Sequence, residues 1–323
     1  MSDYIANKKV WLIGAGTMAI DYAKVLKAQN IDFDVIGRGV KSAKIFTQNT
    51  GSNVITGGLD QYLAQSNGLP TAVIVTVGVE HLAEITIKLI KYGVKRILVE
   101  KPAGIDAGQI QRVAEVAMTN NVEIYVAYNR RFYASAIKAR QIIAEDGGVT
   151  SFNFEFTEWS HEIEHLKKAH GVKEAWFLAN STHVVDLAFF LGGEPKNISA
   201  YIKGGLAWHP SASVFAGAGV TEGGALFSYQ ANWAAPGRWG VEVLTNKHRL
   251  IFRPLEQLHV QRNGSVEIEK VEIDTQFDDQ FKPGIYKQVQ TFLVGDNTES
   301  LLTISEHCER VNRLFSAINY GNK

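Results

Sequence analysis

The first 126 residues alternate between short β-rich apolar runs and longer amphipathic runs, and this alternation strongly constrains the fold. The pattern is typical of βαβ units, in which helices connect parallel strands. The expected strands are 9–13, 33–36, 72–77, 96–99 and 123–127. The expected helices are 17–29, 40–49, 59–65, 81–92 and 106–120, the last with Asp106 as its N-cap. The sequence therefore predicts an α/β fold with a doubly wound Rossmann sheet, whose ligand crevice lies beyond the carboxyl ends of the strands.

The pattern changes after Asn129. A helix expected at 135–144 leads into VTSFNFEFTEW, whose alternation predicts a strand with one buried face. Further strands are expected at 197–203, 224–233, 240–245, 248–254, 258–262 and 266–273, with helices at 181–191, 286–294 and 303–319. We therefore predict a dinucleotide-binding Rossmann domain over residues 1–127. We expect residues 128–323 to form an α+β domain with a large, mostly antiparallel open sheet, used for substrate binding and oligomerisation.

Composition excludes several classes of function. Lysine plus arginine and aspartate plus glutamate number 33 each, so no net charge attracts nucleic acid or an anionic membrane. The single cysteine, Cys308, excludes an intrachain disulfide framework and a cysteine-based zinc site. No run of about 18 apolar residues is present that would span a bilayer. These features predict a soluble, cytoplasmic protein whose partner is a small molecule or another protein.

A glycine-rich loop follows the first expected strand. In VWLIGAGTMA, Gly14, Gly16 and Ala19 form a GxGxxA arrangement that opens a helix. The glycines permit a tight turn and close approach of the backbone to a diphosphate, and the small Ala19 lets the helix pack near the strand. The helix N-terminus supplies N–H groups and a positive dipole. We therefore predict dinucleotide binding at this loop, with Thr17 and Met18 beside it.

The end of the second expected strand bears on the choice of cofactor. Enzymes that use NAD carry an acidic residue about 20 residues beyond the glycines, and Arg38 occupies that place here. Asp34 comes too early to reach the ribose. Arg38, supported by Lys41, Ser42 or Lys44, suits bidentate contact with a 2′-phosphate. We therefore expect NADP as the first choice of cofactor and NAD as the second. The alternative is that Arg38 is a surface arginine that does not discriminate between the two cofactors.

The octapeptide ILVEKPAG places Lys101 between Glu100 and Pro102 at the end of an expected strand. Proline favours extended geometry in the residue before it, so Lys101 stands where the strand ends. A lysine at that edge points into the crevice beyond the sheet. The alternative is a solvated lysine in an ordinary turn from strand to helix.

The stretch ANSTHVVDLAFFLGG supplies further titratable groups. Asn180 or Ser181 can cap a helix on which His183 and Asp186 are three residues apart and therefore share one face. The intrinsic pKa of histidine lies near working pH, which suits a general acid or base. The alternative is a histidine that packs in the core of the domain.

The chain resembles the Gfo/Idh/MocA oxidoreductase family over nearly its whole length. Four features occur in the order found in that family: the glycine loop, Glu100-Lys101-Pro102, the segment YNRRF and the later His183. The resemblance implies a Rossmann domain followed by a domain with a large open sheet. It also implies oxidation or reduction of a sugar or cyclitol carbon with NAD(P). A further implication is assembly into homodimers or homotetramers through the open sheet, and Trp233 or Phe227 on an exposed face of that sheet would suit such an interface. The family's lysine lies near the nicotinamide, often before a cis proline.

Residue roles follow from the resemblance. The family commonly carries Asp-x-x-x-His-x-x-Asp, in which His183 and Asp186 match the last two members, but Ala179 stands in place of the first acid. We therefore prefer His183 as general acid/base and Lys101 as its electrostatic partner. Substrate contacts are assigned to Asn129, Arg130, Tyr133, Trp176, Asn180 and Asp186, with Trp159 and Trp233 as further stacking candidates. Cofactor contacts are assigned to Gly14, Gly16, Thr17, Met18, Ala19, Arg38, Ser42, Thr76, His81, Glu100 and Lys101.

Two other function classes compete. The stretch SHEIEHLKKAH contains His161, Glu162 and His165 in the H-E-x-x-H form of zinc hydrolases, in which two histidines share one helix face. Glu164 between them and the lack of a clear third ligand speak against zinc. A non-catalytic dinucleotide-binding sensor also stays open, because the family acid is missing at Ala179 and a fold alone does not prove an activity.

Overall fold

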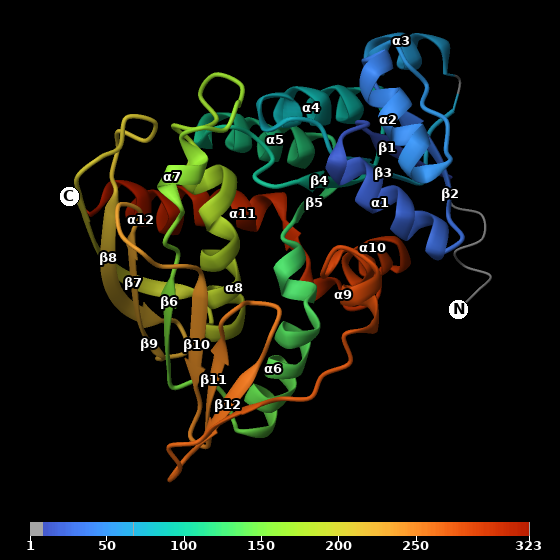
Figure 1. Ribbon diagram of the computed structural model, residues 1–323. Helices are drawn as coiled ribbons and strands as arrows, with labels where there is room; N and C mark the ends of the chain where they lie inside the picture. Colours follow the sequence, from blue (N-terminus) through green and yellow to red (C-terminus); the bar gives the residue numbers. More distant parts are fainter. Residues whose placement is uncertain (1–8, 67, 323) are drawn as a thin grey trace. The chain divides into compact units, whose positions relative to one another are not determined.

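The structure, a computed structural model, describes residues 9–66 and 68–322 and divides into two compact units (Figure 1). The first unit comprises the chain up to Asn129 together with Phe277–Cys308. The second comprises Arg130–Gln276 and the residues from Glu309 onward. Each unit is built around its own sheet.

The first unit is a Rossmann-type sheet with connecting helices. In chain order its elements are β1 (Lys9–Ile13), α1 (Thr17–Ala28), β2 (Asp32–Ile36), α2 (Val40–Thr50), α3 (Gly58–Gln65), β3 (Ala72–Val75), η1 (Val79–His81), α4 (Leu82–Tyr92), β4 (Arg96–Glu100), α5 (Ala107–Thr119) and β5 (Glu123–Ala127). The strand order is β14-β5-β4-β3-β1-β2, and all pairs except β14 with β5 are parallel. The carboxyl ends of β1, β3 and β4 therefore meet at one edge, as predicted.

Apolar strand residues explain why this sheet is buried. Leu12, Ile74 and Leu98 lie opposite one another on three neighbouring strands, and none of them is exposed. Burying each such side chain contributes roughly 1.5–3 kcal/mol. Continuous apolar strands of this kind are expected where helices cover both faces of a parallel sheet.

A late segment completes the first unit. It contains α10 (Ile285–Val294), η4 (Thr298–Ser300) and β14 (Leu302–Thr303), following α9 (Gln276–Gln280). Helix α10 packs on α1, and Leu302 of β14 lies opposite Val126 of β5. Arg96 donates from Nε to the carbonyl oxygen of Phe292 at 3.0 Å. These contacts hold the late segment to the edge of the Rossmann sheet.

The second unit contains an eight-stranded sheet. Its elements are α6 (Ala134–Glu145), β6 (Ser151–Glu155), α7 (Ser160–Ile163), η3 (Phe177–Ser181), α8 (Thr182–Gly192), β7 (Pro195–Lys203), β8 (Val214–Thr221), β9 (Leu226–Asn232), β10 (Gly240–Leu244), β11 (His248–Phe252), β12 (His259–Arg262), β13 (Ile268–Lys270), η5 (Val311–Phe315) and α12 (Ser316–Tyr320). Two further helices, η2 (Asn129–Phe132) and α11 (Ile304–Arg310), begin in the first unit and end in the second. The strand order is β13-β12-β11-β10-β6-β9-β8-β7, and only β6 with β9 is parallel. Helix α8 packs on β6 and β10 (Figure 1). The predicted fold class is confirmed.

Strand β8 is the main element that the sequence did not reveal. Its sequence, VFAGAGVT, is rich in glycine and alanine, which are depleted in strands. A Cβ at Gly217 would lie 2.4 Å from Tyr229 Oη, and one at Gly219 would lie 2.5 Å from Phe227 Cζ. The aromatic rings of β9 therefore cover the backbone of β8, which explains the glycines.

Trp233 and Phe227 do not lie on an exposed face of the sheet, contrary to expectation. Trp233 is 1% exposed and Phe227 is 3% exposed, because both side chains belong to the aromatic core of the second unit. Trp233 stacks on Trp208 with ring centroids 5.6 Å apart. The large apolar side chains that this sheet does expose include Tyr201 and Leu226.

Candidate functional site

The glycine loop lies between β1 and α1. Gly14 has a φ of +115°, and a Cβ there would lie 2.7 Å from Thr76 Oγ1 and 2.9 Å from the carbonyl oxygen of Thr76. The hydroxyl of Thr76 donates to the carbonyl oxygen of Ile13 at 3.0 Å. Thr76 therefore lies directly against the loop, and only glycine fits at position 14.

The start of α1 is open to a ligand. Gly16 caps the helix without a side-chain hydrogen bond, and a Cβ at Gly16 would have no neighbour within 4 Å. Thr17 is exposed and Met18 partly exposed, whereas Ala19 is fully buried beneath the loop. The N–H groups at a helix start suit an anion, so this loop fits the diphosphate of a dinucleotide.

The end of β2 carries a cation rather than an acid. Arg38 is exposed and forms no ion pair with the residues that the structure describes. Ser42 donates to the carbonyl oxygen of Gly39 at 3.0 Å. Asp34, the preceding acid in the sequence, lies within β2, where it pairs with Lys9 at 2.9 Å and accepts from Tyr62 at 3.2 Å. The residue two positions beyond β2 is therefore an exposed arginine, and no acidic side chain occupies that position.

Lys101 is the first residue after β4, as predicted, and its peptide bond to Pro102 is cis. The side chain of Lys101 is buried, with 9% of it exposed. Two flanking groups fix the turn. Tyr22 donates to Glu100 Oε1 at 2.8 Å, and His307 Nε2 lies 3.0 Å from the carbonyl oxygen of Pro102, to which it can donate.

His307 and Tyr22 were not foreseen as parts of this site. Both side chains are fully buried in the first unit. Burial and the negative charge of Glu100 raise the pKa of Tyr22 well above its usual value, so its hydroxyl remains a donor to Glu100. Nothing in the local sequence around either residue points to Pro102 or Glu100, because these contacts join distant segments of the chain.

His81 ends η1 just before α4, beyond the carboxyl end of β3. Its side chain is 40% exposed, and its Nε2 lies 3.8 Å from Glu80 Oε1.

The predicted N-cap of α5 is confirmed, since Asp106 accepts from the backbone N–H of Gln109 at 2.8 Å. The amide of Asn129 donates to the carbonyl oxygen of Pro283 at 2.9 Å within the first unit.

In the second unit, His183 lies in the first turn of α8 and is 7% exposed. Its ring centroid is 6.4 Å from that of Trp239. The guanidinium of Arg130 lies 5.0 Å from the Trp239 ring and 5.9 Å from the Tyr133 ring. The structure thus brings two predicted residues, His183 and Arg130, beside a tryptophan that was not predicted, and a third, Tyr133, beside Arg130.

Ser181 stands at the N-cap position of α8, as predicted, but its side chain makes no capping hydrogen bond. Helix α8 continues from the π-helical turn η3, which includes both Asn180 and Ser181. Asn180 Nδ2 donates to Glu158 Oε1 at 2.9 Å, and Ser181 Oγ donates to the same atom at 2.7 Å. Because the backbone is already helical at these residues, their side chains are available to bind the buried carboxylate of Glu158.

Asp186 is fully buried in an ion-pair network. Arg131 donates to both of its carboxylate oxygens, and Arg310 donates to Oδ1 at 2.6 Å. Arg310 also pairs with Glu194. Trp176 is buried with its ring edge-on to Trp208, at a centroid distance of 6.1 Å.

The H-E-x-x-H stretch does not form the helix that a zinc site requires. Helix α7 ends at Ile163, so His161 and His165 do not share a helix face. The side chains of His161 and His165 are 72% and 79% exposed. Within residues 9–66 and 68–322, no cluster of three or more potential metal ligands occurs, and no helix has the length and apolar character needed to cross a bilayer.

Comparison with known proteins supports the first unit's assignment. Residues 8–128 match the sequence model of the GFO_IDH_MocA group, described as an oxidoreductase family with an NAD-binding Rossmann fold. No curated protein sequence matches the chain significantly.

Solved structures resemble the whole chain. Levoglucosan dehydrogenase in complex with NADH has a TM-score of 0.76 at 16% identity, with 96% of this chain and 95% of that chain covered. The WlbA dehydrogenase from Chromobacterium violaceum, in complex with NADH and UDP-GlcNAcA, has a TM-score of 0.72 at 18% identity, with 97% and 93% covered. UDP-N-acetylglucosamine 3-dehydrogenase GnnA from Acidithiobacillus ferrooxidans has a TM-score of 0.72 at 16% identity, with 97% and 96% covered. At these identities the similarity shows the fold.

The family match covers the glycine loop, Arg38 and the Glu100-Lys101-Pro102 turn. It confirms the resemblance that these residues predicted. Over residues 8–128 the chain matches the Gfo/Idh/MocA family of oxidoreductases, whose model describes an NAD-binding Rossmann fold.

Proposed function

We propose that this protein transfers a hydride between a nicotinamide cofactor and the carbinol or carbonyl carbon of a sugar, cyclitol or sugar derivative. The observation that carries the proposal is the glycine loop, where Gly14 is held against Thr76 and the start of α1 is open. The sugar-related names of two structural neighbours, levoglucosan dehydrogenase and UDP-N-acetylglucosamine 3-dehydrogenase, support the substrate class. We assign the cofactor to the first unit and the substrate to the second.

NADP is the preferred cofactor in this proposal. The exposed guanidinium of Arg38 follows β2, and the nearby Asp34 is already engaged by Lys9 and Tyr62. An arginine fork matches the oxygens of a phosphate, whereas an acid at the same place would repel it. The proposed cofactor site is completed by nine further residues of the first unit: Gly14, Gly16, Thr17, Met18, Ala19, Ser42, Thr76, His81 and Glu100.

The bound nicotinamide supplies the hydride acceptor or donor. Removing a hydride from a secondary alcohol also requires a group that takes the hydroxyl proton and a positive group near the developing alkoxide. We assign the proton to His183 and the positive charge to Lys101, whose buried turn is fixed by Tyr22 and His307. A buried ammonium stabilises an oxyanion more strongly than a solvated one.

Substrate contacts are assigned to Asn129, Arg130, Tyr133, Trp176 and Asn180. Asp186 has both carboxylate oxygens occupied by arginines, so in our proposal it positions α8 and His183 instead of contacting substrate directly. We also propose that copies of the chain associate as a homodimer or homotetramer through the second sheet, where Tyr201 and Leu226 are exposed.

Two measurements test the function. Titration of the protein with NADPH and NADH, followed by energy transfer from tryptophan to the reduced nicotinamide, measures cofactor binding. Incubation with NADP and a panel of sugars and cyclitols, followed by the absorbance of the reduced cofactor, measures hydride transfer. Cofactor binding without transfer to any panel member would favour the non-catalytic sensor, and absence of cofactor binding would refute the proposal.

A further inference from the structure

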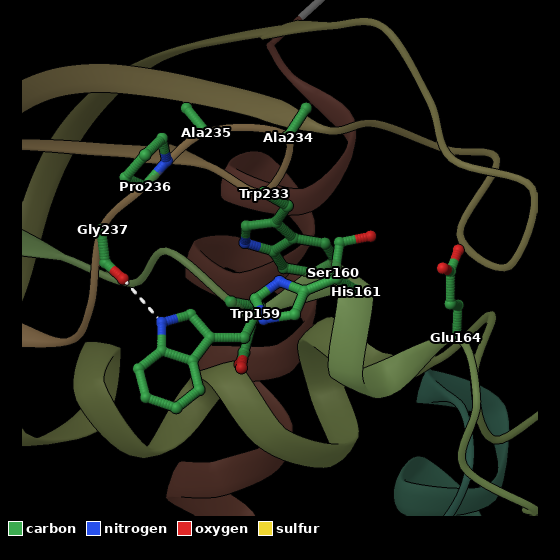
Figure 2. A pocket seen from close by; sticks show the side chains of 10 residues that line it. Trp159, Ser160, His161, Glu164, Trp233, Ala234, Ala235, Pro236 and Gly237 are labelled. Carbon is green, nitrogen blue, oxygen red and sulfur yellow. Dashed lines mark hydrogen bonds between the residues drawn. The ribbon is translucent and has the colours of Figure 1, made fainter.

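A cavity of about 570 Å³ lies within the second unit, next to the start of α7. Its lining comes from two short segments, residues 158–164 and residues 233–237 (Figure 2). This volume is in the range of cavities that bind small molecules. Neither the family match nor the roles assigned above explain its most buried polar group.

That group is the carboxylate of Glu158, which is 2% exposed. Asn180 and Ser181 both donate to Oε1, whereas no such hydrogen bond from the described residues ends on Oε2, although the side chain of Trp176 also acts on this carboxylate. Burial raises the pKa of Glu158, although these two hydrogen bonds and the charge of Arg238 act in the opposite direction. A carboxylate held in this way accepts hydrogen bonds from hydroxyl groups without further reorganisation.

Trp159 provides an apolar wall beside Glu158. Its indole N–H donates to the carbonyl oxygen of Gly237 at 2.9 Å, as Figure 2 shows, so the orientation of the ring is fixed while 47% of the residue stays exposed. The guanidinium of Arg238 lies 4.6 Å from the Trp159 ring and 5.2 Å from the Trp239 ring. Since Trp239 in turn contacts His183, this row of side chains connects the cavity to the proposed general acid/base.

The charges around the cavity restrict its ligand. Its lining contains two carboxylates, Glu158 and Glu164, and neither lysine nor arginine. An anionic group on a ligand would therefore meet like charge from Glu158, which is buried, and from Glu164, which is half exposed. Arg238 is not part of the lining and opposes a cationic group only at the face of the Trp159 ring, over which its guanidinium lies. An uncharged ring with hydroxyl groups meets neither penalty.

We propose that this cavity binds the hydroxyl-bearing ring of an uncharged sugar, and that Glu158 determines specificity by binding a ring hydroxyl and rejecting a carboxylate. As a substrate site, the cavity rests on the function proposed above. The inference narrows the substrate to a sugar that is neutral at the end that enters the cavity.

Methyl β-D-glucoside and methyl β-D-glucuronide test this proposal, because they differ only in a hydroxymethyl group against a carboxylate. Saturation-transfer NMR with the full chain measures the dissociation constant of each probe. We expect the glucuronide to bind wild type at least about tenfold more weakly than the glucoside. Glu158→Gln keeps the Oε1 acceptor but removes the charge, and should bring the two constants within about threefold. Glu162→Gln is the control, since Glu162 lies in the same segment, is 71% exposed and does not line the cavity.

Equal binding of the two probes by wild type, or binding of neither, overturns the proposal, as does an unchanged preference in folded Glu158→Gln. If Glu158→Gln does not fold, Trp159→Ala provides the test instead. This variant removes the half-exposed apolar wall of the cavity and should therefore lose binding of the glucoside. NADPH titration of the same samples separates the two hypotheses. Normal NADPH binding without selective sugar binding refutes the cavity assignment alone, and selective sugar binding without NADPH binding refutes the proposed function alone.

Discussion

Arg131 binds Asp186 through two parallel hydrogen bonds, from Nε to Oδ2 and from Nη2 to Oδ1, each 2.7 Å long. The side chain of Asp186 is completely buried, and that of Arg131 is 4% exposed. Arg310 adds a third bond to the same carboxylate. This arrangement connects η2 and α11 to the middle of α8, three residues beyond His183.

Asp186→Asn should lower the free energy of unfolding by about 3–5 kcal/mol, because it removes the carboxylate charge that the buried guanidinium of Arg131 pairs with, and one of the two acidic partners of Arg310. Urea denaturation measures the loss. Glu269→Gln is the matched control, since Glu269 pairs with Arg262 at 3.5 Å with both side chains about half exposed, and should cost at most about 1 kcal/mol. An Asp186→Asn protein as stable as wild type would show that the network does not hold α8.

The two glycines of the phosphate loop should respond differently to alanine. Gly14→Ala places a Cβ against Thr76 at a positive φ and should lower the free energy of unfolding by about 1–3 kcal/mol. Gly16→Ala meets no protein atom within 4 Å, so stability should change by less than about 0.5 kcal/mol. The new methyl group would nevertheless obstruct a diphosphate, so NADPH affinity should fall at least about tenfold. Thermal melts and NADPH titration of both variants check this, and unchanged affinity in Gly16→Ala would argue against a dinucleotide at this loop.

Arg38→Ala should weaken NADPH binding and leave NADH binding unchanged. A charged contact with the 2′-phosphate contributes about 1.5–3 kcal/mol, which corresponds to roughly tenfold to a hundredfold in affinity. Titration of both cofactors measures the effect, with exposed Lys91 changed to alanine as a control. Equal NADPH and NADH constants in wild type, or an unchanged NADPH constant in Arg38→Ala, would contradict the cofactor preference.

The raised pKa of Glu158 makes stability depend on pH. The folded state holds the Glu158 proton more tightly than the unfolded state, whose pKa is about 4.5. The free energy of unfolding therefore falls as pH rises from the unfolded pKa through the folded pKa, and stays reduced above it. Glu158→Gln has no such proton, so its melting temperature should increase relative to wild type across this window.

Melting curves of both proteins over a series of pH values test this expectation. The contributions of other groups, such as the lowered pKa of His209, cancel in the difference. Arg238, Glu164 and His161 are the charged or titratable groups around the same cavity, and variants at each would show how far they shift the window. A pH-independent difference would show that Glu158 does not change its protonation between the folded and unfolded states.

The first unit could be predicted well from the sequence because its signals are local. The βα alternation, the GxGxxA loop and Asp106 as a helix cap each depend on residues close together in the chain. Strand β8 escaped prediction because its glycines reflect the rings of Phe227 and Tyr229 on the neighbouring strand. Such a requirement is tertiary and leaves no periodic pattern.

The candidate site was predictable only where a motif marked it. Lys101 follows β4 as the proline suggested, and His183 lies in α8. Glu158, Trp239 and His307 were missed because their partners are 22 or more residues away in sequence, as for Asn180 with Glu158. The H-E-x-x-H stretch, by contrast, indicated a zinc site that its structure does not support, because α7 ends before the second histidine of the stretch.

Single-turnover hydride transfer by Lys101→Met tests the central claim most directly, with exposed Lys91→Met as the control. The substitution keeps the apolar stem of Lys101 but removes its charge, so fold and NADPH affinity should be retained. With a sugar or cyclitol that wild type turns over, we predict that the rate falls by about 10²–10⁴, the scale of a positioned acid–base or oxyanion group. His183→Ala should fall comparably, and the double variant should lose much less than the product of the two. A folded Lys101→Met protein that binds NADPH and transfers hydride at the wild-type rate would contradict the account.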